Sequence, residues 1–337
     1  MAQSESTEPV LDRDLPTPKT SALAAQAPRK KRWTERVPVV SHLRQSVGLQ
    51  RGMLVAGLVI TGIFVLVAIF APLIAPYSWA QQAVDGVKFG TQQPPNATNI
   101  LGTTVSGFDV YSRVIWGSQT ALLVILAAIA CSIFVGIALG LIAGYFGGWL
   151  DRVMVVIADA IYAFPSLLLA IVLTIVIGHG QSGLFNGIMA TALSITVVFV
   201  PQYFRVIRAE VVRVRAEPFV ESAKVIGVPT GRILMRHVLR NSTRSLPVVI
   251  TLNASEALLT LAGLGFLGFG IEATSAAEWG YDLNRSIADV TSGIWWTSIF
   301  PGLAIVLVVL GITLVGESLN DLSDPRLRTR RRAGGAA

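Results

Sequence analysis

Long apolar runs separated by short polar segments dominate the pattern along this chain. A run of roughly 20 apolar residues is long enough to cross the hydrocarbon core of a bilayer as a helix. Six stretches come close to or exceed this length, and together they predict six transmembrane helices. They cover residues 53–75, 120–145, 152–177, 187–204, 246–268 and 298–316. Asp159 and Pro165 interrupt the third run, and the fifth contains one acid, Glu256.

The polar segments between these runs divide the chain into regions. We expect residues 1–52 to form a largely disordered cytoplasmic tail that ends in a short interfacial helix. The first transmembrane helix follows over 53–76 and an external loop over 77–118. A five-helix core over 119–318 includes a polar loop at 205–245, and a basic cytoplasmic tail covers 319–337.

Composition and charge support a membrane protein and set its orientation. The chain is 53% hydrophobic and only 14% charged, against about 25% charged in soluble domains. With the N-terminus inside, 24 of the 27 Lys and Arg residues fall on the cytoplasmic side. Cytoplasmic loops are enriched in these residues, so both termini are expected in the cytoplasm of a multi-pass protein. The basic segment at 29–33 either contacts anionic lipid or only reinforces this topology.

Motifs for enzymatic chemistry are missing from the sequence. It contains no G-x-x-x-x-G-K-[ST] phosphate loop, no H-E-x-x-H and no G-x-S-x-G, and its three His residues are scattered. We therefore expect no catalytic residue, no metal site and no nucleotide cofactor in this chain. Transport, channel and scaffold functions remain.

One polar and basic stretch, residues 219–241, stands out in the loop between the fourth and fifth runs. Pro218 suits the first position of a helix, with Glu217 before it. Gly227 supplies a left-handed stop. Thr230 is expected to cap a second helix. One apolar face is predicted from Phe219, Ser222, Ala223 and Ile226. The simpler alternative is a solvated basic loop, which explains the charge but not the paired helix signals.

The stretch also carries a signature that resembles a known family. The pattern E-[AS]-A-x-x-x-G, followed twelve residues later by Leu, resembles the cytoplasmic signature of the permeases of ABC importers. Its residues here are Glu221, Ser222, Ala223, Gly227 and Leu239. The resemblance implies that the loop forms a coupling helix, which sits in a groove of the ATPase subunit and receives its nucleotide-driven movement. Arg240 departs from the family, which usually has Pro at this position.

Further segments narrow the resemblance to one branch. They are LGTTVSGFDVYSRVIWGSQTALLV (101–124), GLIAGYFGGWLDRVM (140–154), DAIYAFPSLLLAIVL (159–173), RHVLRN (236–241), GFLGFG (265–270), EWG (278–280) and DPRLR (324–328). In this order they resemble the C-type subunit of dipeptide, oligopeptide and nickel permeases. Thr104, Phe108 and Leu261 depart from the pattern, because the family has Asp, Arg and an acid there.

The resemblance implies an all-α type I ABC-importer permease that moves di- or oligopeptides across the bacterial plasma membrane by alternating access. Nickel, glutathione and other peptide-like solutes are alternatives within the family. A secondary transporter or channel without an ATPase is the alternative of a different class. Implied partners are a second homologous permease, two ATP-binding subunits that hold ATP and Mg, an extracytoplasmic solute-binding protein and membrane lipid, but no nucleic acid.

Ionisable groups inside a span usually face a partner or an aqueous path. Glu256 and Asp159 are therefore candidates for the translocation pathway, where they would meet the amine or amide of a peptide. The alternative for each is a hydrogen-bonded structural acid between helices. Pro165 is expected to kink its helix and free a carbonyl toward the pathway. Four glycines at 263, 265, 268 and 270 indicate close helix packing or a gate.

Overall fold

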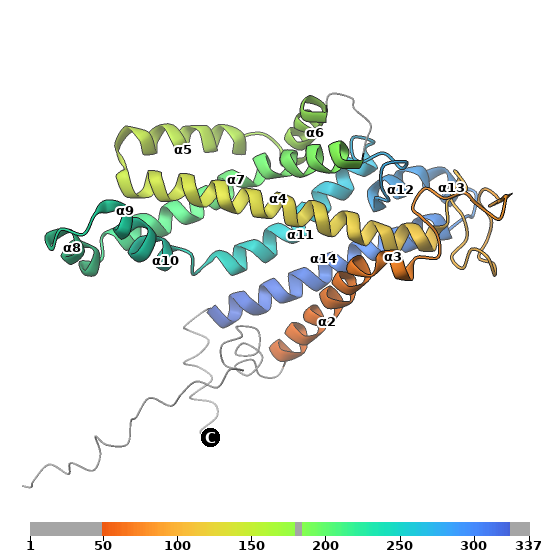
Figure 1. Ribbon diagram of the computed structural model, residues 1–337, viewed down its shortest axis with the longest axis horizontal. Coiled ribbons are helices and arrows are strands. Elements are labelled where there is room, and N and C mark those ends of the chain that lie inside the picture. The colour runs from red at the N-terminus through yellow and green to blue at the C-terminus, as the bar shows by residue number, and fades with distance from the viewer. Residues whose placement is uncertain (1–48, 179–183, 324–337) are drawn as a thin grey trace, which may run out of the picture. The chain divides into compact units, whose positions relative to one another are not determined.

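The computed structural model describes residues 49–178 and 184–323, and these are mostly helical (Figure 1). The predicted all-α membrane fold is confirmed. Most of the predicted tails, over 1–48 and 324–337, lie outside the described residues.

The elements follow in chain order. The first part of the chain has α2 (Leu49–Ile69), α3 (Ala71–Ile74), β1 (Ala83–Val84), β2 (Val87–Lys88), α4 (Val110–Phe146), α5 (Gly148–Tyr162), α6 (Ser166–Gly178) and α7 (Leu184–Arg215). The second part has α8 (Pro218–Val225), α9 (Thr230–Arg232), the π-helix η2 (Ile233–Val238), α10 (Leu239–Ser242), α11 (Leu246–Phe266), α12 (Trp279–Arg285), α13 (Ile287–Thr291) and α14 (Trp296–Ser323). β1 and β2 form a small antiparallel hairpin.

Among the residues that the structure describes, five helices, α2, α4, α7, α11 and α14, are long and apolar enough to cross a membrane. The predicted third span is not one continuous helix, because α5 and α6 meet at an angle of 95°. The two count as a sixth, broken span if taken together. The bend lies at the predicted kink: Pro165 has no N–H to donate, and it disfavours helical backbone at the residue before it.

Two helices extend well beyond their predicted apolar runs. α4 begins at Val110, where the Asp109 side chain accepts a hydrogen bond of 2.8 Å from the Ser112 N–H. α7 continues to Arg215, so the first eleven residues of the predicted loop 205–245 are helical. Hydropathy marks the part of a helix that lipid can surround, whereas capping groups decide where its hydrogen bonds begin and end.

The bundle is built on close helix packing. α4 lies along α7, and a Cβ at Gly136, Gly140 or Gly144 would collide with α7. Small residues let two helices approach closely. Within lipid, the van der Waals packing gained in this way holds helices together, because the hydrophobic effect does not. α14 packs between α2 and α11, while α6 packs on α7. The small helices α8–α10 lie at one end of the bundle, and α12, α13 and the β1–β2 loop lie at the other (Figure 1).

Candidate functional site

The first helix of the α8–α10 unit begins and ends where the sequence predicts. Pro218 is the first residue of α8, and Glu217 occupies the cap position without a side-chain hydrogen bond. Gly227 has a φ of 78°. There its N–H donates to the Lys224 carbonyl and the Val228 N–H donates to the Ala223 carbonyl, both at 3.0 Å. This pair of bonds is the Schellman stop, which requires a left-handed residue.

Two predicted details of the unit are wrong. Thr230 is the first residue of α9, and Pro229 rather than Thr230 occupies the cap position. The buried face of α8 consists of Val220 and Ala223, whereas Phe219 and Ile226 are exposed. An eight-residue helix has little periodicity of its own, so the elements it packs on, α7 and η2, decide which side turns inward.

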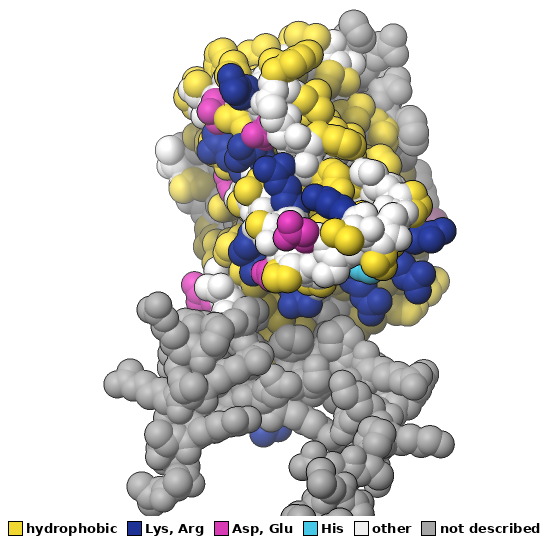
Figure 2. Space-filling model, turned by 90° about the vertical axis from the view of Figure 1, so that its left-hand side faces the viewer, with side chains coloured by type: hydrophobic (Ala, Val, Ile, Leu, Met, Phe, Trp, Pro, Cys, Tyr) yellow, Lys and Arg dark blue, Asp and Glu magenta, His cyan; other side chains and the backbone are white. Residues whose placement is uncertain are grey.

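The exposed side of the α8–α10 unit combines apolar and basic residues. Val225 and Ile226 are 82% and 78% exposed, and Phe219 and Met235 are also exposed. The exposed basic residues of this end are Arg213, Lys224, Arg232, Arg236, Arg240 and Arg244. Figure 2 shows this end, with Lys and Arg side chains spread among hydrophobic ones. Exposed patches of large apolar side chains mark surfaces that contact another protein or a membrane.

The five signature residues divide between this surface and the core. Glu221, Ser222 and Gly227 are exposed, and the Ser222 hydroxyl donates to the Pro218 carbonyl at 2.9 Å. Ala223 is buried, and Leu239 packs partly buried against the core. Arg240, where the family has Pro, is exposed in α10 within a helical stretch that runs from Thr230 to Ser242.

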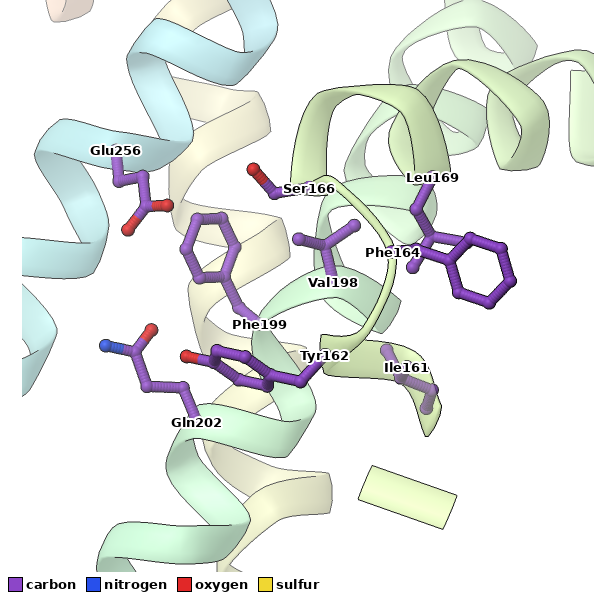
Figure 3. A pocket seen from close by; sticks show the side chains of 9 residues that line it. All are labelled: Ile161, Tyr162, Phe164, Ser166, Leu169, Val198, Phe199, Gln202 and Glu256. Carbon is purple, nitrogen blue, oxygen red and sulfur yellow. The ribbon is translucent and has the colours of Figure 1, made fainter. Parts of the chain in front are cut away.

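A cavity of about 210 Å³ opens where the bend between α5 and α6 faces α7 and α11 (Figure 3). It is lined by Ile161, Tyr162, Phe164, Ser166, Leu169, Val198, Phe199, Gln202 and Glu256. Four of these side chains are polar, and Glu256 is the only charged one among them. The structure therefore brings the predicted acid of the fifth run to the bend at Pro165.

Asp159 does not line this cavity. Its carboxylate accepts a hydrogen bond of 2.6 Å from Arg205 of α7, and the two side chains form an ion pair that is about half exposed. The Arg205 guanidinium also lies over the ring of Tyr162, 4.4 Å from its centroid. A second ion pair, between Asp151 and Arg208, joins the same two helices. Asp159 therefore fits the alternative to a pathway residue, which is a hydrogen-bonded structural acid between helices.

A buried polar cluster at the α12–α13 end was not predicted. Arg113 of α4 is 1% exposed and pairs with Asp282 of α12 at 2.7 Å. The guanidinium also donates to the Trp79 carbonyl at 3.0 Å. The predicted external loop over 77–118 includes Arg113, which the structure instead places in α4. The only signal was an Arg next to an apolar run, with no indication of which acid it would meet.

Glu278 completes this cluster as the cap of α12. Its carboxylate accepts hydrogen bonds from the Gly280 and Tyr281 N–H groups at 2.8 and 2.6 Å. Burial raises the pKa of Glu278 to about 8, although these two bonds oppose the shift. A Cβ at Gly265 would overlap the Glu278 carboxylate, and Gly268 has a φ of 82° just past α11. The glycines at 265 and 268 thus have packing and turn roles.

No metal site is visible in the part of the chain that the structure describes: residues 49–178 and 184–323 contain no group of three or more His, Cys, Asp and Glu side chains suited to an ion.

Comparison with known proteins identifies relatives over most of the chain. Residues 136–329 match the family described as binding-protein-dependent transport system inner membrane component. Residues 49–95 match the N-terminal TM domain of oligopeptide transport permease C. The dipeptide transport system permease protein DppC of Alkalihalophilus pseudofirmus is 38% identical over 82% of this chain and 86% of that protein.

Two further relatives carry different names for their solutes. The di/tripeptide transport system permease protein DppC of Pseudomonas aeruginosa is 35% identical over 84% of this chain and 91% of that protein. The glutathione transport system permease protein GsiD of Pectobacterium atrosepticum is 32% identical over 85% and 89%, respectively.

Proposed function

Because this chain belongs to the family of binding-protein-dependent transport system inner membrane components, we propose that it carries di- or oligopeptides across the membrane by alternating access. Members of this family are multi-pass permeases of ABC transporters and not enzymes; partner ATPases hydrolyse the ATP. This membership selects an ATP-driven importer over a secondary transporter or channel.

The peptide solute is supported chiefly by the 38% identity to a dipeptide permease over 82% of the chain. The other relatives named above are called di/tripeptide and glutathione permeases, and glutathione is itself a small peptide. Glutathione is therefore the second candidate. Nickel has less support, because a metal site needs several ligands and the cavity contains one carboxylate.

The proposed assembly contains a second homologous permease, two ATP-binding subunits and an extracytoplasmic solute-binding protein. ATP and Mg belong to the ATP-binding subunits. The exposed apolar side chains Val225 and Ile226, together with the exposed basic residues of this end, support the α8–α10 unit as the ATPase contact. In this arrangement Glu221 and Gly227 lie on the contact surface, and Ala223 and Leu239 tie it to the core.

The proposed orientation in the membrane has the α8–α10 end and both termini in the cytoplasm. The concentration of Lys and Arg at this end supports it, because such residues are retained on the cytoplasmic side. The α12–α13 end then faces the solute-binding protein. The pathway passes the cavity at Glu256, and the bend at Pro165 allows α5 and α6 to move separately when ATP binding closes the ATPases. Asp159 lies next to this route and holds α5 to α7.

The coupling role is tested by changing the contact surface without changing the core. Glu221→Arg reverses an exposed charge, and Gly227→Arg adds a long side chain at a left-handed position. Gly52→Arg, at an exposed glycine in the first turn of α2 with open space around it, is the control for an arginine added outside the α8–α10 unit.

We expect both α8–α10 variants to insert normally but to separate ATP hydrolysis from peptide uptake in reconstituted vesicles, while the control keeps them coupled. Co-purification from the native membrane supplies the second measurement. Coupled uptake at the unaltered rate in both variants, or an importer that purifies without ATPase subunits, would contradict the proposal.

A further inference from the structure

We infer that the cavity at the α5–α6 bend is a binding subsite for a primary ammonium group, with the Glu256 carboxylate as its counter-ion. The inference builds on the proposed function in one respect: a peptide is the source of the ammonium. The electrostatic part of the argument depends only on the described side chains.

Glu256 is the acid in this region that has no counter-ion. Of the hydrogen bonds and ion pairs among residues 49–178 and 184–323, none reaches its carboxylate. The nearby cation Arg205 is already neutralised by Asp159 at 2.6 Å and covered by the Tyr162 ring. The cavity therefore keeps one uncompensated negative charge. Because such a charge is expensive within a span, a cation that enters the cavity is stabilised there.

The other lining groups suit an ammonium in particular. Figure 3 shows the Glu256 carboxylate and the Ser166 hydroxyl on one side of the Phe199 ring, with the Gln202 amide and the Tyr162 hydroxyl on the other. An ammonium has three N–H donors and no acceptor, so oxygen acceptors such as the Glu256 carboxylate and the Ser166 hydroxyl suit it. The aromatic faces add cation–π attraction. A carboxylate ligand would instead be repelled by Glu256.

The ammonium has two sources in a peptide, the N-terminus and a lysyl side chain. Inorganic cations fit less well, because divalent ions favour several oxygen ligands and often more than one carboxylate. The volume of about 210 Å³ is far larger than one water molecule requires, so the cavity has room for the group that carries the ammonium.

The charge of the cavity is tested with thiol reagents of equal size and opposite sign. Cys131, which is exposed, is first changed to Ser, and Ser166→Cys then places one thiol in the lining. We expect the ratio of cationic to anionic methanethiosulfonate reaction rates to fall roughly tenfold when Glu256→Gln is added. Glu317→Gln, an exposed acid of α14, should leave the ratio unchanged.

Gln202→Cys supplies a second reporter if the first variant does not fold. An unchanged ratio at both positions would overturn the inference. This readout does not require import, so it decides the charge of the cavity even if the proposed peptide transport is refuted.

Uptake then identifies the source of the ammonium. Dialanine has only the N-terminal ammonium, whereas alanyl-lysine has both. In vesicles with the complete importer and its binding protein, we expect Glu256→Gln to slow dialanine uptake about tenfold, as loss of a charged hydrogen bond would. Slower uptake of alanyl-lysine alone would assign the subsite to the side chain. Unchanged uptake of both would overturn ammonium binding. If the unaltered importer takes up neither peptide, the proposed function fails and the thiol test still decides the subsite.

Discussion

The buried ion pair between Arg113 and Asp282 ties the start of α4 to α12, 169 residues later in the chain. The Arg113 Nε atom lies 2.7 and 2.9 Å from the two Asp282 carboxylate oxygens. Arg113 is 1% exposed and Asp282 is 6% exposed. Arg113→Met keeps most of the buried aliphatic volume and removes the charge, so it tests the pair with little change in packing.

The expected cost follows from what the substitution leaves behind. Removing one partner of a buried pair costs about 3–5 kcal/mol, because the remaining charge has neither water nor a counter-ion. The Trp79 and Ala273 carbonyls also lose their Arg113 donor, at about 1 kcal/mol for each bond, and the longer bond at 3.4 Å contributes less. Together these terms give about 4–7 kcal/mol, and we take the lower end, about 4 kcal/mol, as the expected loss of stability for local opening at α12.

Hydrogen exchange of the α12 amides in the purified importer measures this opening. A loss of about 4 kcal/mol corresponds to protection that is roughly a thousandfold lower. Adding Asp282→Asn to Arg113→Met removes the remaining charge and should recover at least about 2 kcal/mol. A loss below about 1 kcal/mol in the single variant, or no recovery in the double variant, would show that the pair is not the interaction holding this end together.

Three further changes test neighbouring claims. Burial raises the pKa of Glu278 from 4.5 to about 8, so the folded state binds more protons than the unfolded state between these pH values. Protection of the α12 amides from hydrogen exchange should therefore fall as the pH rises through that window, and Glu278→Gln should flatten this pH profile. Gly227→Ala forces Cβ into a left-handed position at about 1–2 kcal/mol and should lower ATPase-coupled uptake, whereas Gly231→Ala, in open space, should not. Asp159→Asn should change stability by less than about 1 kcal/mol, because its pair with Arg205 is half exposed; a larger loss in a thermal melt would show a stronger tie between α5 and α7.

Local features of the fold were predictable because they depend on neighbours in sequence. The length of an apolar run indicates a membrane-spanning helix whatever surrounds it. Pro218, Pro165 and Gly227 act on their own backbone, so a helix start, a bend and a helix stop were correctly expected at these positions. The face of α8 and the length of α7 were not predictable, because packing and capping decide them.

The membrane class, the approximate spans and the start and stop of α8 can therefore be inferred from the order of residues alone. The pairing of polar groups depends instead on how the helices pack in space. Asp159 and Glu256 looked alike as acids within apolar runs, yet one lies 2.6 Å from Arg205 and the other faces a cavity. Arg113 likewise found its acid in a distant helix. The physical reason is that a charge near or within the membrane must find a partner or water in space, and chain order does not specify which one.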